Sequence, residues 1–159
     1  THGAEVAAHE LGWGMDYEAV QLTGPPPEVL SGIRLCHPDD LSHRYVSGSA
    51  APDAMVICPC SVNVVGRIAA GLGDVLITRA AAVCLKERRP LVLVVRESPL
   101  SLIDLRNLVR VAEAGAIVMP AAPPLYAAAA TIEEMAEYFA VRVLDQAGLR
   151  LEHPGRWDV

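Results

Sequence analysis

Short runs of consecutive apolar residues alternate along the chain with longer stretches in which apolar residues recur at helical spacing. Three such runs cover residues 54–58, 91–95 and 116–119. Continuous apolar runs of this length are typical of strands that are buried on both faces of a sheet. Because helical stretches separate the runs, the pattern predicts a three-layer, doubly wound parallel α/β sheet with the three strands as neighbours.

Capping residues set the expected limits of the first two helices. Pro59 ends the first apolar run, and Ser61, two residues later, predicts the start of a helix that extends to about Leu72. Asp74 is expected to cap a second helix that ends at Arg89, before Pro90.

Two further helices are predicted nearer the carboxyl terminus. One spans residues 101–114, and the other spans residues 131–147 and begins with a capping-box pattern at residues 131–134. The helix over 101–114 is expected to carry its apolar face on Leu102, Leu105, Val109 and Ala112.

Composition and charge narrow the class of protein. The chain has 159 residues, which suits one domain, and its formal net charge of −6 argues against a nucleic-acid-binding face. No apolar run approaches the ~18 residues of a membrane-spanning helix. The four cysteines form no CxxC pair, so we expect buried, reduced thiols and a cytoplasmic location.

Polar residues follow each predicted strand, where ligands bind in sheets of this kind. Ser61 is either a plain helix cap or a residue that helps to hold an anion at the start of the helix. The chain contains no GxGxxG or Walker motif, so the standard sequence signatures of dinucleotide and nucleoside-triphosphate sites are absent. Arg96 and Glu97 form either a structural ion pair or a reactive pair in which Glu97 moves protons. Tyr126 follows the third strand, and packing alone would also explain it.

Two cationic positions lie elsewhere, and each has a simple structural explanation. The first is Lys86, which opens a run of charged residues at 86–89 that is typical of a solvated helix end. The second is Arg142 in the last helix, whose long side chain can reach solvent.

Longer blocks of sequence resemble the UbiX-like flavin prenyltransferases, and the resemblance covers nearly the whole chain. The blocks are SGS at 47–49, AMVICPCS at 54–61, LITRAA at 76–81, LKERRPLVLVVRE at 85–97, GAIVMP at 115–120, PLY at 124–126, RVLDQ at 142–146 and RW at 156–157.

The resemblance implies a flavodoxin-like, Rossmann-type fold that binds FMN and needs no metal. It implies transfer of a dimethylallyl group from dimethylallyl phosphate to N5 and C6 of reduced FMN. The prenylated FMN would then serve a partner decarboxylase, in ubiquinone biosynthesis or in aromatic-acid breakdown. It also implies a homo-oligomer, typically a dodecamer.

The same resemblance assigns roles to particular residues. It places Arg96 against the flavin and makes Glu97 the proton-transfer residue, with Glu10 as a further active-site glutamate and Arg79 on a matching motif arginine. The FMN-binding turn would consist of Ser61, Val62, Asn63 and Val64, and the prenyl phosphate would be held by Lys86, Tyr126 and Arg142, in part from neighbouring subunits.

The chain departs from the family pattern in three places. No GASG loop is present, so we expect a strand–helix–strand unit to be missing before Thr1. Asn63 and Val64 replace the usual Lys or Gly followed by Thr, and alanines at 127–130 replace a polar stretch.

Two alternatives to prenyl transfer stay open. A related cysteine-type decarboxylase would rely on a histidine, for which none of the five histidines is a persuasive equivalent. A non-catalytic FMN-binding protein would suit the alanine patch.

Overall fold

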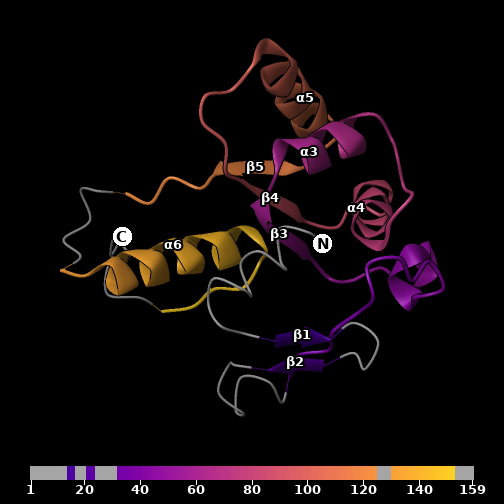
Figure 1. The fold of residues 1–159 in the computed structure, drawn as a ribbon, viewed down its shortest axis with the longest axis horizontal. Helices are drawn as coiled ribbons and strands as arrows, with labels where there is room; N and C mark the ends of the chain where they lie inside the picture. The colour runs from indigo at the N-terminus through magenta and orange to yellow at the C-terminus, as the bar shows by residue number, and fades with distance from the viewer. Residues whose placement is uncertain (1–13, 17–20, 24–31, 125–129, 153–159) are drawn as a thin grey trace.

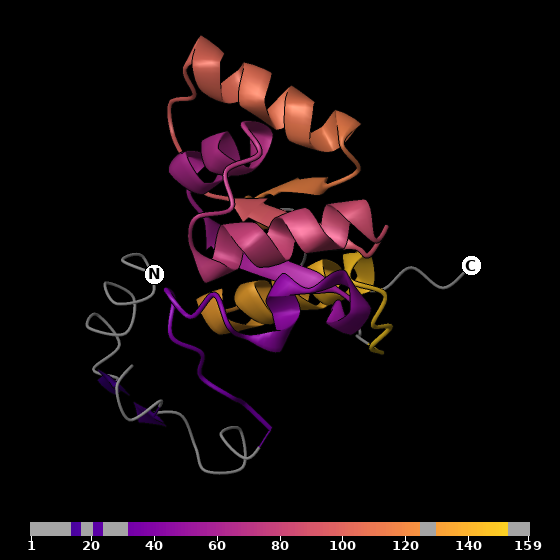
Figure 2. The same ribbon diagram turned by 90° about the vertical axis from the view of Figure 1, so that its right-hand side faces the viewer.

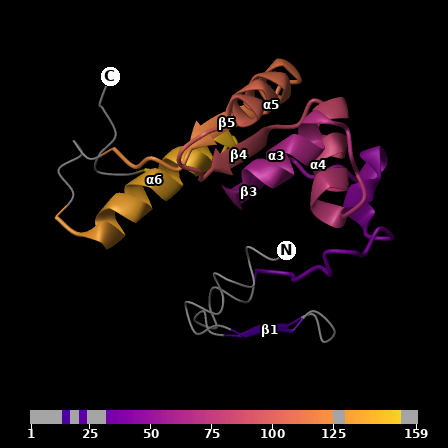
Figure 3. The same ribbon diagram turned by 45° about the horizontal axis from the view of Figure 1, so that its top comes forward.

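The computed structural model of the chain describes residues 14–16, 21–23, 32–124 and 130–152. Its centre is a parallel sheet of β3 (Met55–Cys60), β4 (Leu91–Val95) and β5 (Ile117–Pro120), in the order β3-β4-β5. Figure 3 shows β4 and β5 pointing the same way. The three predicted strands are therefore neighbours, as expected.

Helices cover both faces of this sheet (Figure 1). One face carries α3 (Val62–Ala69), α4 (Leu76–Lys86) and α5 (Leu102–Glu113), and the other carries α6 (Ile132–Gln146). The predicted three-layer, doubly wound arrangement is confirmed: the helices that connect the parallel strands cover one face, and α6, which follows β5, covers the other.

The core forms on the two faces of β4, all five residues of which are buried. Leu91, Leu93 and Val95 join the cluster under α3, α4 and α5. Val92 and Val94 join Val143 and Ala147 of α6 on the opposite side. This alternation follows from the two-residue period of a strand.

Strand β3 differs from the expectation in two respects. It continues through Pro59 to Cys60, and Cys58 and Pro59 are exposed although burial on both faces was predicted. Among the described strands β3 pairs with β4 alone, and its register slips between Ile57 and Cys60. A bulge of this kind turns side chains out of the regular alternation.

Two of the three predicted helix caps, Ser61 and Thr131, are confirmed. The Ser61 hydroxyl accepts the Val64 amide hydrogen at 3.4 Å, and the Thr131 hydroxyl accepts that of Glu134 at 3.1 Å. Ser101 forms a full capping box with Asp104, which was not predicted.

The predicted limits of the second helix are wrong at both ends. Asp74 does not cap α4, because its carboxylate forms an ion pair with Arg67 of α3. The helix ends at Lys86, and Arg88 adopts a left-handed φ of 56°. The Arg89 amide then bonds back to the Cys84 carbonyl at 2.8 Å, which closes the helix three residues before the expected end.

Helix α5 faces the core with a different side from the one predicted. Val111 is buried, and Leu108 packs against the core cluster. Leu102, Leu105 and Val109 are exposed. The spacing identified an apolar stripe correctly, but that stripe lies on the outer side of the helix.

Several shorter elements complete the described chain. The antiparallel pair β1 (Gly14–Asp16) and β2 (Gln21–Thr23) was not predicted. Ser47 precedes the short 3₁₀ turn η2 (Gly48–Ala50), which follows another turn, η1 (Arg44–Val46). Figure 2 shows these turns as purple coils near the α4 ribbon.

The cysteines are all free, but only two fit the expected burial. Cys60 and Cys84 are buried, whereas Cys36 is half-buried and Cys58 is exposed. In the described segments, the structure contains no helix that is both long enough and apolar enough to span a bilayer.

A pair of valines on α5 tests which face of the helix supports the fold. Val111→Ala removes two buried methyl groups, so we expect a loss of about 2 kcal/mol in the free energy of unfolding. Val109→Ala on the exposed side should change it by less than about 0.5 kcal/mol. Urea unfolding of dilute protein measures both, and equal losses would contradict the observed orientation of the helix.

Candidate functional site

Backbone hydrogen bonds hold together the segments that leave the carboxyl ends of the three strands. The Arg96 amide donates to the Cys60 carbonyl at 3.2 Å, and the Ala121 amide donates to the Val95 carbonyl at 2.8 Å. The residues that follow β3 and β4 are therefore adjacent, as the parallel topology predicted. Tyr126, which was expected to join them, lies outside the described residues.

Ser61 begins α3 at this edge and is exposed. Its hydroxyl caps the helix by accepting the Val64 amide hydrogen, so the capping role is real. The amides of Val62 and Asn63 lie in the first turn, where backbone N–H groups have no acceptor within the helix. The helix start therefore presents two N–H donors and a positive dipole end to any anionic group bound there.

The four residues of the predicted FMN-binding turn do not all contribute in the same way. The side chains of Val62 and Val64 pack against the core cluster, which leaves their main chain to face a ligand. Ser61 and Asn63 are exposed, so their side chains point to solvent at the edge of the sheet.

Arg96 and Glu97 follow β4 directly and are both exposed. A Glu97 carboxylate oxygen accepts the Ser98 amide hydrogen at 3.1 Å. Within the described segments no ion pair joins Glu97 to Arg96, which argues against the structural ion pair that the sequence left open. Both charged groups are thus placed to meet a ligand beside Ser61.

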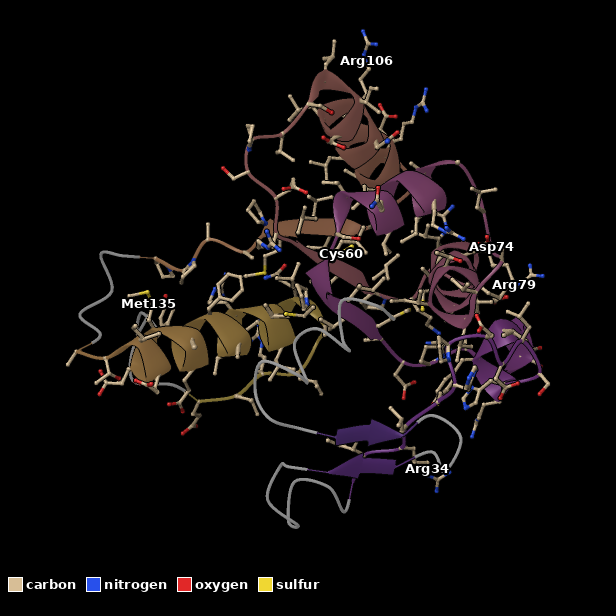
Figure 4. The ribbon with its side chains drawn as sticks, viewed as in Figure 1. Arg34, Cys60, Asp74, Arg79, Arg106 and Met135 are labelled. Atoms are coloured by element: carbon tan, nitrogen blue, oxygen red, sulfur yellow. The ribbon has the colours of Figure 1, made fainter. Side chains whose placement is uncertain are left out.

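Beneath this edge lies the Cys60 thiol, which is fully buried. Burial, with a smaller contribution from Cys58, raises the pKa of the Cys60 thiol to about 12. The thiol is therefore neutral at physiological pH and adds no negative charge below Ser61 and Arg96 (Figure 4 labels Cys60 at the centre of the sheet).

Lys86 lies at the opposite edge of the sheet. It ends α4, five residues before β4 starts at Leu91, and its ammonium group pairs with Glu87. Arg96 comes directly after the other end of β4, and five residues of strand span about 17 Å. One chain therefore does not bring Lys86 and Arg96 to the same small ligand.

Gly48 is a position that the sequence did not single out as functional. A Cβ atom there would collide with the charged ends of Lys86 and Glu87. The turn η2 therefore packs directly over this ion pair, and a larger residue at position 48 would displace the ends of these two side chains. The sequence signal was Gly48's place between two serines in a block shared with the flavin prenyltransferases.

Arg142 lies in the α6 layer, next to Val143, which packs under β4. Its guanidinium Nη1 lies 2.9 Å from a carboxylate oxygen of Asp145, whose side chain is only 9% exposed. Arg142 itself is half exposed, so it reaches solvent as the simpler explanation expected.

Of the two remaining predicted residues, the structure describes Arg79 and does not bring it to this edge. Arg79 is exposed on α4, and Figure 4 shows it beside Asp74, apart from Cys60. Glu10 lies outside the described residues. Across the described segments, no three His, Cys, Asp or Glu side chains cluster as a metal site.

Comparison with known proteins gives a consistent family. The Flavoprotein family model matches residues 33–143. Flavin prenyltransferases UbiX of Thermoplasma acidophilum and Pseudomonas aeruginosa are 48% and 43% identical over 119 and 125 residues, or 75% and 79% of this chain. The chain spans 66% and 60% of the length of these two relatives. The flavin prenyltransferase UbiX of Deinococcus radiodurans is 46% identical over 84% of this chain and 70% of its own length.

Solved structures agree. The structure of AnUbiX (PadA1) in complex with FMN and dimethylallyl pyrophosphate has 39% identity and a TM-score of 0.74, covering 86% of this chain and 75% of that one. A dodecameric FMN-dependent UbiX-like decarboxylase from Escherichia coli O157:H7 has 36% identity and a TM-score of 0.76, covering 89% and 77%. The chain belongs to the Flavoprotein family, among the UbiX-like flavin prenyltransferases.

Proposed function

We propose that this protein is a flavin prenyltransferase that moves a dimethylallyl group from dimethylallyl phosphate to reduced FMN and so makes prenylated FMN. The observation that carries the proposal is the hydrogen bond between the Arg96 amide and the Cys60 carbonyl, which places Ser61, at the start of α3, beside Arg96 and Glu97. That edge stands in a chain 43–48% identical to flavin prenyltransferases.

The residues present fit FMN as the bound flavin. The Ser61 hydroxyl, the amides of Val62 and Asn63 and the Arg96 guanidinium offer donors and positive charge on one side of the edge. Val64 supports the turn through its packing and its bond to Ser61. Reduced FMN supplies the atoms, N5 and C6, that receive the prenyl group.

Breaking the allylic C–O bond leaves negative charge on the departing phosphate, so cations are needed beside it. Lys86 and Arg142, with the Tyr126 hydroxyl, are the residues we assign to that phosphate. Bond formation at the flavin also releases a proton, and the exposed Glu97 carboxylate beside Arg96 is placed to accept it. We assign Glu10 to the same active site.

The separation of Lys86 from Arg96 implies that a working site takes residues from more than one copy of the chain. We therefore propose a homo-oligomer, with a dodecamer as the expected form. The similar FMN-dependent UbiX-like decarboxylase from Escherichia coli O157:H7 is described as dodecameric.

We further propose that the product passes to a decarboxylase that depends on prenylated FMN. We also propose that the enzyme is cytoplasmic, because its cysteines are free.

Mass spectrometry of the flavin after anaerobic incubation tests the reaction itself. Protein, reduced FMN and either dimethylallyl phosphate or dimethylallyl pyrophosphate should yield flavin heavier by one prenyl group. An FMN that binds but keeps its mass with both donors would instead support a non-catalytic flavin-binding protein. Oxidative decarboxylation of a cysteinyl peptide would support the cysteine-type decarboxylase, which the prenyltransferase relatives do not favour.

Glu97→Gln should lower single-turnover prenylation by about 100-fold or more while FMN affinity stays close to that of the parent protein. Glutamine keeps an oxygen that can accept the Ser98 amide hydrogen, but it cannot take up the proton. Glu133→Gln, at an exposed glutamate on α6, is the matched control and should leave the rate unchanged. A normal rate in Glu97→Gln would remove Glu97 from the mechanism.

Lys86→Ala and Arg142→Ala should mainly weaken binding of the prenyl phosphate. Loss of one charge-assisted contact to phosphate corresponds to roughly 10-fold or more in the donor concentration needed for half-maximal rate. Flavin titration should give an unchanged dissociation constant for FMN in both variants. A fall in FMN affinity with unaltered donor dependence would show that these residues serve the flavin instead.

A further inference from the structure

Helix α5 carries an apolar stripe on the side that faces away from the sheet. We call its four residues the outer stripe: Leu102, Leu105, Val109 and Ala112. All four are exposed, with 61%, 46% and 56% of the surface accessible for the first three. Their spacing of three and four residues aligns them along about 15 Å of helix.

The outer stripe is not needed to hold α5 on the domain. On the inner side Val111 is buried, Leu108 packs on the core, and the Asn107 amide closely approaches Gly66 of α3. Figures 1 and 2 show α5 as the outermost element, with no described segment beyond it. The helix therefore has two apolar faces, and the described segments cover only one of them.

A continuous apolar surface of this kind is costly to leave in water, and in soluble proteins it marks a contact site. Single exposed apolar residues are common, but a stripe that repeats over three helical turns is not explained by chance exposure. The stripe also lies beside a polar margin formed by Arg106, Arg110 and Glu113. Figure 4 shows Arg106 pointing outward from α5.

The charges on α5 suit a second copy of the same chain. Asp104 and Glu113 balance Arg106 and Arg110, so the helix has a net charge of zero, whereas the whole chain carries −6. Two copies can therefore bring these helices together without net charge repulsion between them. The arginines and Glu113 lie along one side of the apolar stripe, as polar residues do at the rim of an apolar contact.

We propose that the outer stripe of α5 is a contact surface between copies of this chain. This inference rests on the proposed assembly, and it specifies which surface carries the contact. It makes α5 a helix with two functions, since its inner face closes the core and its outer face joins a neighbour.

Sedimentation equilibrium of the full chain without flavin tests the contact. Leu102→Glu places a charge on the stripe and should weaken self-association by about tenfold or more. Leu149→Glu is the matched control, because Leu149 is 58% exposed and lies outside α5. The control should keep the parent association. The inference fails if the parent chain is monomeric at every concentration or if Leu102→Glu associates as the parent does.

A second measurement leaves the stripe's other residues intact. A photo-crosslinking amino acid at Val109 should give covalent dimers, and one at Leu149 should give few. Circular dichroism confirms that both variants are folded. Absence of a crosslink from Val109 in an associating sample would overturn the inference. Flavin prenylation is assayed separately, so a chain that associates through α5 but makes no product would refute the proposed reaction and leave this contact standing.

Discussion

Strand β4 exposes no more than 7% of any of its five side chains, so each of its faces needs a covering layer. Alternate residues Leu91, Leu93 and Val95 require one layer, and Val92 and Val94 require the other. Helices α3, α4 and α5 meet the first requirement and α6 meets the second. Parallel pairing with β3 and β5 gives the backbone N–H and C=O groups of β4 hydrogen-bond partners along both of its sides. The positions of Ser61, Arg96 and Glu97 at one edge and of Lys86 at the other follow from this arrangement.

Because the strands are parallel, the residues that follow them gather at one edge and the residues that precede them gather at the other. Ser61, Arg96 and Glu97 belong to the first group. Lys86 belongs to the second, held by Glu87 and by the close approach of Gly48. A fold of this kind cannot unite the two groups within one chain, and association between copies is the direct way to do so.

Much of this arrangement could be predicted from the sequence, because it depends on local signals. The β4 run is apolar throughout, and Ser61, Ser101 and Thr131 stand where helix starts need a side-chain acceptor. The adjacency of Ser61 and Arg96 followed from topology alone. Errors arose where two interactions compete for one residue. Asp74 had the right chemistry for a cap, but the distant Arg67 takes its carboxylate.

Other features could not be read from spacing. On α5 both Leu102–Leu105–Val109 and Leu108–Val111 have helical spacing, and periodicity does not say which set faces the sheet. The exposure of Cys58 depends on a bulge in β3 and on how many strands pair with it. The role of Gly48 depends on a contact with residues almost forty positions away, which no local pattern encodes.

Mixing two inactive variants tests the central claim most directly. Lys86→Ala and Arg96→Ala each disable one edge of the sheet, so at a donor concentration far below the one that Lys86→Ala needs for half-maximal rate, each protein alone should be nearly inactive in prenylation. If sites form between copies, dissociating and reassembling the two together should restore prenylated FMN, because some sites then combine an intact Lys86 from one chain with an intact Arg96 from another. A reassembled mixture that exchanges subunits but stays as inactive as its parents would contradict a shared prenyltransferase site.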